Sequence, residues 1–121
     1  MAQENFKPMI VHLILAGKTE LAITFLSQTY RVTVPKLQVG LPKKHKTRAY
    51  GTYTAKTQMI SVQNSDILTN PFVVLHEFYH HLRSSGVDKM HRGTEKNADT
   101  FARDYLVAYQ NAIKKAQDYI Q

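Results

Sequence analysis

The sequence predicts a single α+β domain over residues 1–121, with helices toward both ends and a small, mostly antiparallel sheet between them. Near the N-terminus and again after residue 70, apolar residues recur at intervals of three and four, which is typical of amphipathic helices. Between these regions, β-prone residues alternate with polar ones, as they do in half-buried strands. A chain of 121 residues can bury one core without disulfides or a structural metal.

The N-terminal third is expected to contain helix followed by strand. Residues 5–30 predict two short helices, or one kinked helix, because the apolar spacing is interrupted at Gly17. Residues 31–41 predict one or two short strands interrupted at Pro35, which cannot donate a hydrogen bond to a neighbouring strand. The segment 42–48, PKKHKTR, is polar and strongly basic, so we expect a solvated loop there.

The middle of the chain predicts a hairpin and then a buried helix. Residues 49–65 fit a β-hairpin with its turn near residues 55–58 and its second strand over residues 59–63. A helix is expected from Pro71, which the first turn of a helix tolerates, to Gly86. Its buried stripe is predicted to contain Phe72, Leu75, Phe78 or Tyr79, and Leu82.

The C-terminal quarter predicts a final long helix. After a loop over residues 85–93, this helix is expected to begin near Thr94, a suitable N-cap. The small residues Ala98 and Ala102 flank one of its faces. This face could therefore approach the preceding helix closely.

Composition limits the possible functions. The chain has no cysteine, which excludes a disulfide framework, a cysteine zinc finger, a thiol nucleophile and an iron–sulfur cluster. Any metal site must therefore use His, Asp and Glu. The 16 Lys and Arg residues exceed the 9 Asp and Glu residues, and the resulting charge of +7 favours acidic partners.

The longest apolar stretch, residues 9–17, is too short to span a bilayer and contains His12. The chain also lacks a convincing signal-peptide pattern. We therefore expect a soluble, cytoplasmic protein without a membrane partner.

The segment HEFYHH at residues 76–81 spaces histidines around one glutamate. On a helix, His76 and His80 lie on one face, where two ring nitrogens can point at a common ion. Glu77 lies about 100° around the axis from His76. In an H-E-x-x-H helix this glutamate is the general base and not a metal ligand. His81 points about 100° away from His80, so we expect it at the rim of the site or behind a ligand.

A catalytic zinc ion needs a third protein ligand, and it keeps its fourth position for water. The first candidate is Glu95, with Asp99 four residues later on the same helix face to accept the outward N–H of a ligating histidine. Alternatively, Glu95 only stabilises the positive end of the helix dipole. The second candidate ligand is His91, although the metzincin spacing would place the last histidine at Gly86.

These residues resemble a known family. HEFYHHL followed by TEKNADTFARDYL is similar to the H-E-x-x-H and E-x-x-A-[DN]-x-F-A signatures of the ImmA/IrrE metallopeptidases, in the gluzincin class. The resemblance covers roughly residues 49–106 and implies a zincin-like minimal metallopeptidase fold that binds one zinc ion. It also implies an endopeptidase acting on extended segments of intracellular regulatory proteins. The residues so implied are the zinc ligands His76, His80 and Glu95, the general base Glu77, and Asp99 behind a ligand.

The sequence differs from the family signatures in two places, and other functions also fit some of the same residues. The LLMP that usually ends the second signature is DYLVAY here, and the loop from His80 to Glu95 is short. SprT-like proteases, which act on DNA-bound proteins, take a third histidine from a following loop, and His91 would be that residue. A proteolytically silent descendant would use zinc only to join its last two helices. A basic nucleic-acid-binding module with a structural zinc would contact phosphates, or another acidic partner, through Lys43, Lys44, Lys46 and Arg48.

Two features of a peptidase site are left open by the sequence. An extended peptide could add to the free edge of the strand at residues 59–63. The group that stabilises the oxyanion is not assigned. The candidates for it are Tyr50, Tyr53, Tyr79 and His81.

Overall fold

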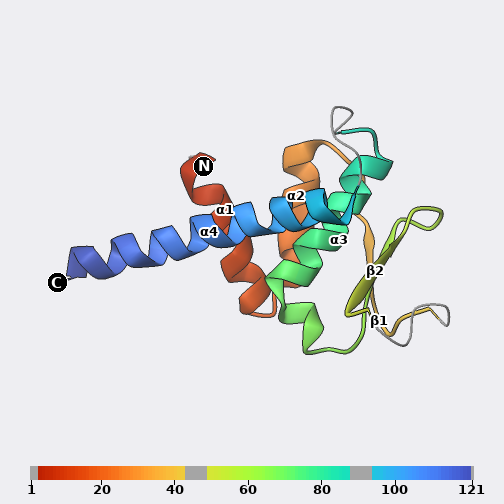
Figure 1. Ribbon diagram of the computed structural model, residues 1–121, viewed down its shortest axis with the longest axis horizontal. Coiled ribbons are helices and arrows are strands. Elements are labelled where there is room, and N and C mark those ends of the chain that lie inside the picture. The colour runs from red at the N-terminus through yellow and green to blue at the C-terminus, as the bar shows by residue number, and fades with distance from the viewer. Residues whose placement is uncertain (1–2, 43–48, 88–93, 121) are drawn as a thin grey trace.

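Four α-helices and a three-stranded sheet make up the structure, a computed structural model that describes residues 3–42, 49–87 and 94–120. The expected α+β class is confirmed. Figure 1 shows the sheet on one side of α3 and the C-terminal end of α4 projecting in the opposite direction. In chain order the elements are α1 (Gln3–Leu15), α2 (Thr19–Tyr30), β1 (Lys36–Val39), β2 (Gly51–Thr54), β3 (Met59–Val62), a short 3-10 helix (Ile67–Thr69), α3 (Pro71–Ser84) and α4 (Glu95–Ile120).

The expected break near Gly17 is confirmed, and it produces two separate helices. Gly17 has φ +82°, a left-handed conformation that glycine adopts at little cost. The turn is closed by a backbone hydrogen bond of 2.8 Å from the Lys18 N–H to the Leu13 carbonyl. The chain therefore reverses and packs α2 against α1.

Helix α3 begins and ends close to where the sequence predicts. Pro71 occupies its first turn, and the side chain of Asn70 accepts a hydrogen bond of 3.2 Å from the Val73 N–H. The helix stops at Ser84, two residues before Gly86, which has φ +79°. Most of its side chains are buried, including four of the predicted stripe: Leu75, Phe78, Tyr79 and Leu82.

The sheet departs from the prediction in two ways. Its strand order is β1-β3-β2, with β1 parallel to β3 and β2 antiparallel to it, so the sheet is mixed rather than mostly antiparallel. The β2-β3 hairpin is confirmed, but β1 pairs with the other side of β3, which makes β3 the central strand. The expectation of a free edge at residues 59–63 was therefore wrong. Among the strands of the described residues, the edge positions belong to β1 and β2.

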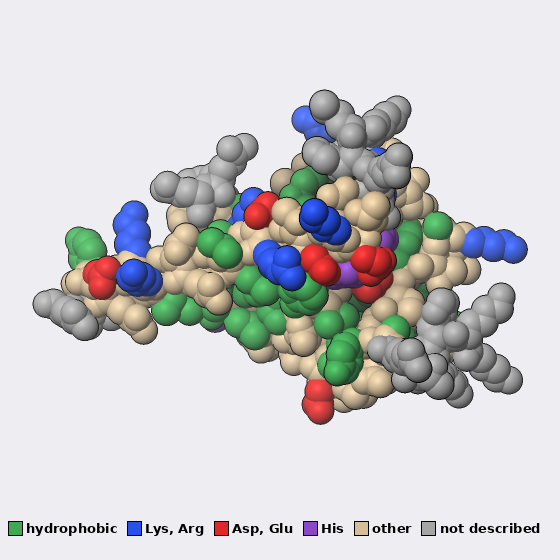
Figure 2. All heavy atoms as spheres, in the orientation of Figure 1, with side chains coloured by type: hydrophobic (Ala, Val, Ile, Leu, Met, Phe, Trp, Pro, Cys, Tyr) green, Lys and Arg blue, Asp and Glu red, His purple; other side chains and the backbone are tan. Residues whose placement is uncertain are grey.

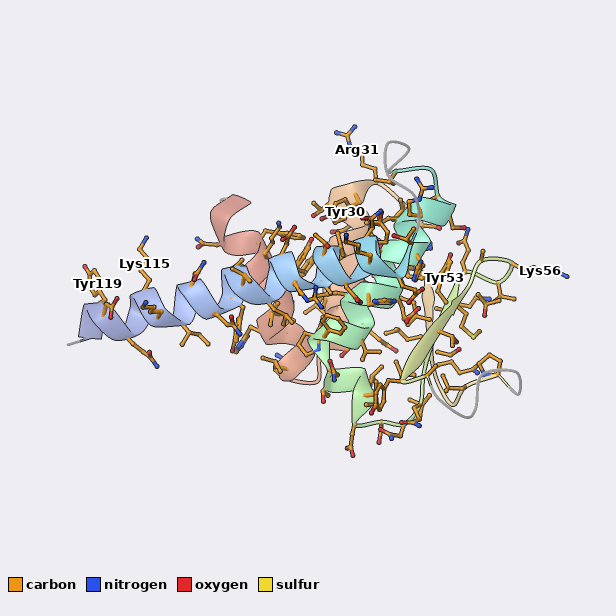
Figure 3. All side chains as sticks on the ribbon, viewed as in Figure 1. Tyr30, Arg31, Tyr53, Lys56, Lys115 and Tyr119 are labelled. Carbon is orange, nitrogen blue, oxygen red and sulfur yellow. The ribbon has the colours of Figure 1, made fainter. Side chains whose placement is uncertain are left out.

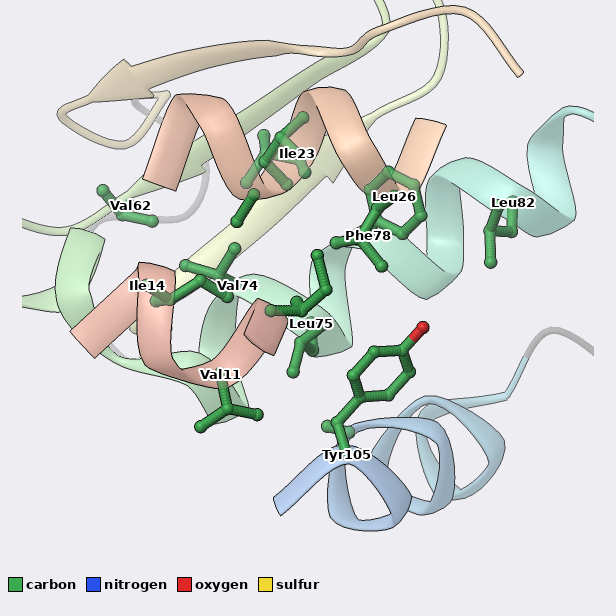
Figure 4. Packing of buried hydrophobic residues seen from close by; sticks show 14 residues of the cluster. Val11, Ile14, Ile23, Leu26, Val62, Val74, Leu75, Phe78, Leu82 and Tyr105 are labelled. Carbon is green, nitrogen blue, oxygen red and sulfur yellow. The ribbon is translucent and has the colours of Figure 1, made fainter. Parts of the chain in front are cut away.

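The core lies between the helices and one face of the sheet. Figure 4 shows apolar side chains from α1, α2, β3, α3 and α4 meeting there, with Tyr105 of α4 among them. The hydroxyls of Tyr30 and Tyr105 lie 2.7 Å apart, and burial raises the pKa of both. Ala98 and Ala102 are fully buried, so the first half of α4 packs closely against α3, as predicted. Within the described ranges, no helix combines the length and apolar character needed to cross a membrane.

Candidate metal centre

Two histidines of α3 and one glutamate of α4 converge beside the sheet. His76 Nε2 lies 2.7 Å from Glu95 Oε2, and His80 Nε2 lies 3.0 Å from Glu95 Oε1. The ligand atoms of these three residues all lie within 4.8 Å of one another, so the group could hold a metal ion. Figure 2 shows histidine atoms between acidic side chains on this face of the molecule.

Local folding explains why these residues meet. His76 and His80 are one helical turn apart on α3, so their rings project on one side. Helix α4 begins at Glu95, and its first turn is capped by Thr94, whose Oγ1 accepts a 3.2 Å hydrogen bond from the Asn97 N–H. The predicted N-cap is thus confirmed. Because α4 packs closely on α3 just beyond this turn, the Glu95 carboxylate reaches both rings.

Asp99 supports the first of these histidines, as the sequence predicts. Its Oδ1 lies 2.8 Å from His76 Nδ1, on the side of the ring that faces away from Glu95. A carboxylate in this position can accept the Nδ1 proton and orient the ring, so that Nε2 would be available to a metal ion. Each ring nitrogen of His76 therefore contacts a carboxylate, Asp99 at Nδ1 and Glu95 at Nε2.

Glu77 lies beside the histidines without joining the ligand group. Its Oε2 is 3.9 Å from His76 Nε2, and only about a tenth of its side chain is exposed. Burial raises the pKa of Glu77 to about 7; the charge of His76 opposes this rise and the charge of Glu95 adds to it. A carboxyl group in this environment takes up a proton readily near neutral pH.

Strand β2 forms the wall opposite the histidines, and Gly51 allows it to come close. A Cβ at this position would lie 2.8 Å from Val73 Cγ1 and 3.3 Å from Glu77 Cγ, so a larger residue would push the strand away from α3. Sequence reasoning missed this contact, although a glycine inside a β-prone segment is a signal of close backbone approach.

Two hollows open on either side of Glu77. The first is lined by Gly51, Thr52, Tyr53, Glu77, His80 and Glu95. The second is more apolar and includes Ala49, Tyr50, Phe72, Val73, His76 and Asp99 in its lining.

His81 is not at the rim of the site, and the expectation that placed it there or behind a ligand was wrong. It is fully buried, with Nε2 2.7 Å from the Thr33 carbonyl and Nδ1 2.8 Å from the Tyr53 hydroxyl. Because a carbonyl only accepts, Nε2 carries the proton; burial lowers the pKa of His81, so the neutral ring accepts the Tyr53 O–H at Nδ1. The side of α3 that carries His81 is covered by β2 and by the segment before β1.

The remaining predicted residues fall into three groups. Tyr50 and Tyr53 line the hollows, whereas Tyr79 is buried with its ring 5.5 Å from the ring of Phe101. Thus two of the four oxyanion candidates are at the site. The loop residues His91, Lys43, Lys44, Lys46 and Arg48 lie outside the described residues.

No family model matches this chain, and no curated protein or solved structure matches it either. Any assignment of function therefore depends on the residues and their geometry.

Proposed function

We propose that the chain is a zinc-dependent endopeptidase of the ImmA/IrrE-like, gluzincin kind, acting on extended segments of regulatory proteins. One observation carries the proposal. His76, His80 and Glu95 converge as three potential ligands, and the buried Glu77 stands beside them. This is the donor set and the neighbouring base that the H-E-x-x-H signature and its partner helix require.

The donor atoms fit a zinc ion. His76 Nε2 and His80 Nε2 lie 2.7 and 3.0 Å from the two Glu95 carboxylate oxygens, and the ligand atoms of the three residues all lie within 4.8 Å of one another. Because the ligands of a tetrahedral zinc ion lie about 3.4 Å apart, these contacts would lengthen by less than about 1 Å around an ion. Two imidazoles and one carboxylate also leave a fourth position open, as catalytic zinc sites do. Zinc bound there would polarise the scissile carbonyl and lower the pKa of the attacking water.

The chain's own residues would handle the protons and the orientation of the ligands. Glu77 would accept the proton of the attacking water and deliver it to the leaving amine, because its carboxylate lies 3.9 Å from His76 Nε2 and is largely buried beside the ligand group. Asp99 would hold His76 in the tautomer that leaves Nε2 free.

The free edge of β2 is the place where an extended substrate would bind. It borders the hollow that contains Glu77 and His80, and no described strand pairs with it on that side, so an extended peptide could add there. A substrate antiparallel to β2 would run from Thr54 toward Gly51. Residues after the scissile bond would then approach the more apolar hollow near Phe72.

Tyr50 is the better candidate for contact with the oxyanion. The hydroxyl proton of Tyr53 is used in its hydrogen bond to His81. Tyr50 is 61% exposed and lines the same hollow as His76 and Glu77, so its hydroxyl is free to turn toward a substrate.

The proposal is tested with the zinc-loaded protein and an unfolded substrate such as casein. We expect cleavage that a chelator stops and added zinc restores. Glu77→Gln should keep the zinc and lower kcat by about 10²- to 10⁴-fold. Glu20→Gln, an exposed site on α2, is the matched control and should change nothing. Equal turnover by Glu77→Gln and the unaltered protein would contradict the assignment.

The DNA-associated alternative is less well supported, because Glu95 already provides a third potential ligand without His91. The formal charge of +7 is the observation in its favour. Cleavage that requires DNA and is lost in His91→Ala would favour this alternative. Salt-sensitive nucleic-acid binding that survives removal of zinc would favour a binding module instead.

A further inference from the structure

The C-terminal end of α4 projects beyond the rest of the molecule. Its first half packs on α3 and α1, but residues 110–119 are exposed along their whole length (Figure 1). Tyr119 is 91% exposed and Ile113 is 41% exposed. Figure 3 shows Tyr119 and Lys115 on this end of the helix with no other described element beside them.

This projecting end is amphipathic. Tyr109, which is half-buried against the core, is followed by Ala112, Ala116 and Tyr119 at intervals of three, four and three, so the four residues form one stripe on the helix, and Ile113 lies next to it. The stripe continues the face that buries Tyr105 in the core. A lone helical end of about ten residues is marginal in water, so a partner on this stripe would stabilise it.

The stripe is self-complementary. Its pattern, Tyr-x-x-Ala-x-x-x-Ala-x-x-Tyr, is the same read in either direction. In a contact with two-fold symmetry, if residue i of the first copy contacts residue j of the second, then residue j of the first copy also contacts residue i of the second. An antiparallel pair of these helices would set Ala112 against Ala116 of the other copy, where small side chains allow close approach, and Tyr109 against Tyr119. Ile113 would lie near its own counterpart beside the axis.

Charge favours a second copy over an acidic or anionic partner. Helix α4 as a whole contains four Lys or Arg and four Asp or Glu, so the formal charge of +7 comes from the rest of the chain, and residues 109–119 carry Lys114, Lys115 and Asp118, a formal charge of +1. Two copies can therefore meet through α4 with little repulsion, whereas an acidic partner would find its complement elsewhere. Lys115 flanks the stripe near the proposed axis, so a small residual repulsion should be screened by salt.

We propose that residues 109–119 of α4 bind the same residues of a second copy of this chain in an antiparallel, two-fold contact. The body of the second copy would lie beyond the C-terminal end of the first helix, which leaves both candidate metal centres uncovered. A contact of this length is at the low end of interface sizes. The dimer should therefore be weak, with a Kd of about 10–500 µM. The proposal is independent of the peptidase assignment.

The test is sedimentation equilibrium of the full chain over a range of concentrations, with two matched variants. Ala116→Glu puts a charge in the centre of the contact and should weaken dimerisation at least about tenfold. Asn111→Glu puts the same charge on the opposite side of the helix and should leave the Kd within about twofold. Circular dichroism checks that both variants keep their helix content. Higher salt should tighten the dimer slightly. A chain that stays monomeric up to about 1 mM, or a dimer indifferent to Ala116→Glu, would overturn the proposal.

Cross-linking tests the register, because the chain has no native cysteine. A mixture of Ala112→Cys chains and Ala116→Cys chains should form the mixed disulfide in preference to either symmetric one. Preferred symmetric disulfides would indicate a parallel pair and contradict the antiparallel contact. Binding of the monomer to phosphatidylglycerol vesicles, lost in Ala116→Glu without any dimer forming, would assign the stripe to a membrane surface and also overturn the proposal.

Discussion

The two sides of α3 carry neighbouring histidines with opposite surroundings. His80 faces an open hollow, with Nε2 3.0 Å from the Glu95 carboxylate. His81, the next residue, is fully buried and bonded at both ring nitrogens, to Thr33 and Tyr53. Burial lowers the pKa of both rings, yet only His80 is part of a group that could hold a metal ion. His80 faces α4 and His81 faces β2, so the element packed against each ring determines the environment of that ring.

The largest expected effect separates these two histidines. His81→Ala should destabilise the metal-free protein by about 3–5 kcal/mol, because it leaves a cavity and two unpaired polar groups. His80→Ala should change the free energy of unfolding much less, because its ring lies at a hollow, but it should abolish zinc binding. Urea unfolding and zinc titration of both variants check this. Similar losses of stability in the two variants would remove the distinction between the two sides of α3.

The next effect concerns pH and Glu77. In the metal-free folded protein, burial raises the pKa of Glu77 to about 7, above the ordinary value of 4.5 expected in the unfolded chain. Between these values the folded state holds a proton that the unfolded state has lost, so this carboxyl contributes stability at low pH. That contribution should fall by about 3 kcal/mol as the pH rises through this window. The pH dependence of unfolding in chelator, compared with that of Glu77→Gln, isolates it; identical curves would contradict the predicted burial.

A smaller effect tests the carboxylate behind His76. Asp99→Asn should weaken zinc binding by about 10- to 100-fold, because the amide orients the ring less well and does not raise its basicity. Asp104→Asn, an exposed site on the same helix, is the matched control. Competition with a fluorescent zinc chelator measures both affinities. Equal affinities for the two variants would mean that Asp99 does not support a ligand.

Much of the candidate site was predictable, because its pattern is local. The four-residue spacings of His76 and His80, and of Glu95 and Asp99, each place two groups on one helix face. Ala98 and Ala102 indicated that the two helices approach closely, and both are buried between them. Helix boundaries were equally local, since glycine, proline and capping residues mark them.

The predictions that were wrong, the strand order and the position of His81, depend on contacts between segments that are far apart in sequence. Pairing β1 with β3 joins segments that are far apart in sequence, and alternation alone does not specify strand order. The burial of His81 follows from the same packing, because β2 and the Thr33 segment cover that side of α3. A helical wheel gives the angle between His80 and His81, but it does not reveal which of the two residues faces solvent.

The zinc content of the purified chain and of two variants tests most directly whether His76, His80 and Glu95 form a zinc site. We expect about one zinc ion per chain, loss of zinc in Glu95→Ala, and retention of zinc in His91→Ala. Unfolding curves confirm that both variants remain folded. Retention of zinc in Glu95→Ala with its loss in His91→Ala, or no zinc binding by the unaltered chain, would contradict a zinc site formed by His76, His80 and Glu95.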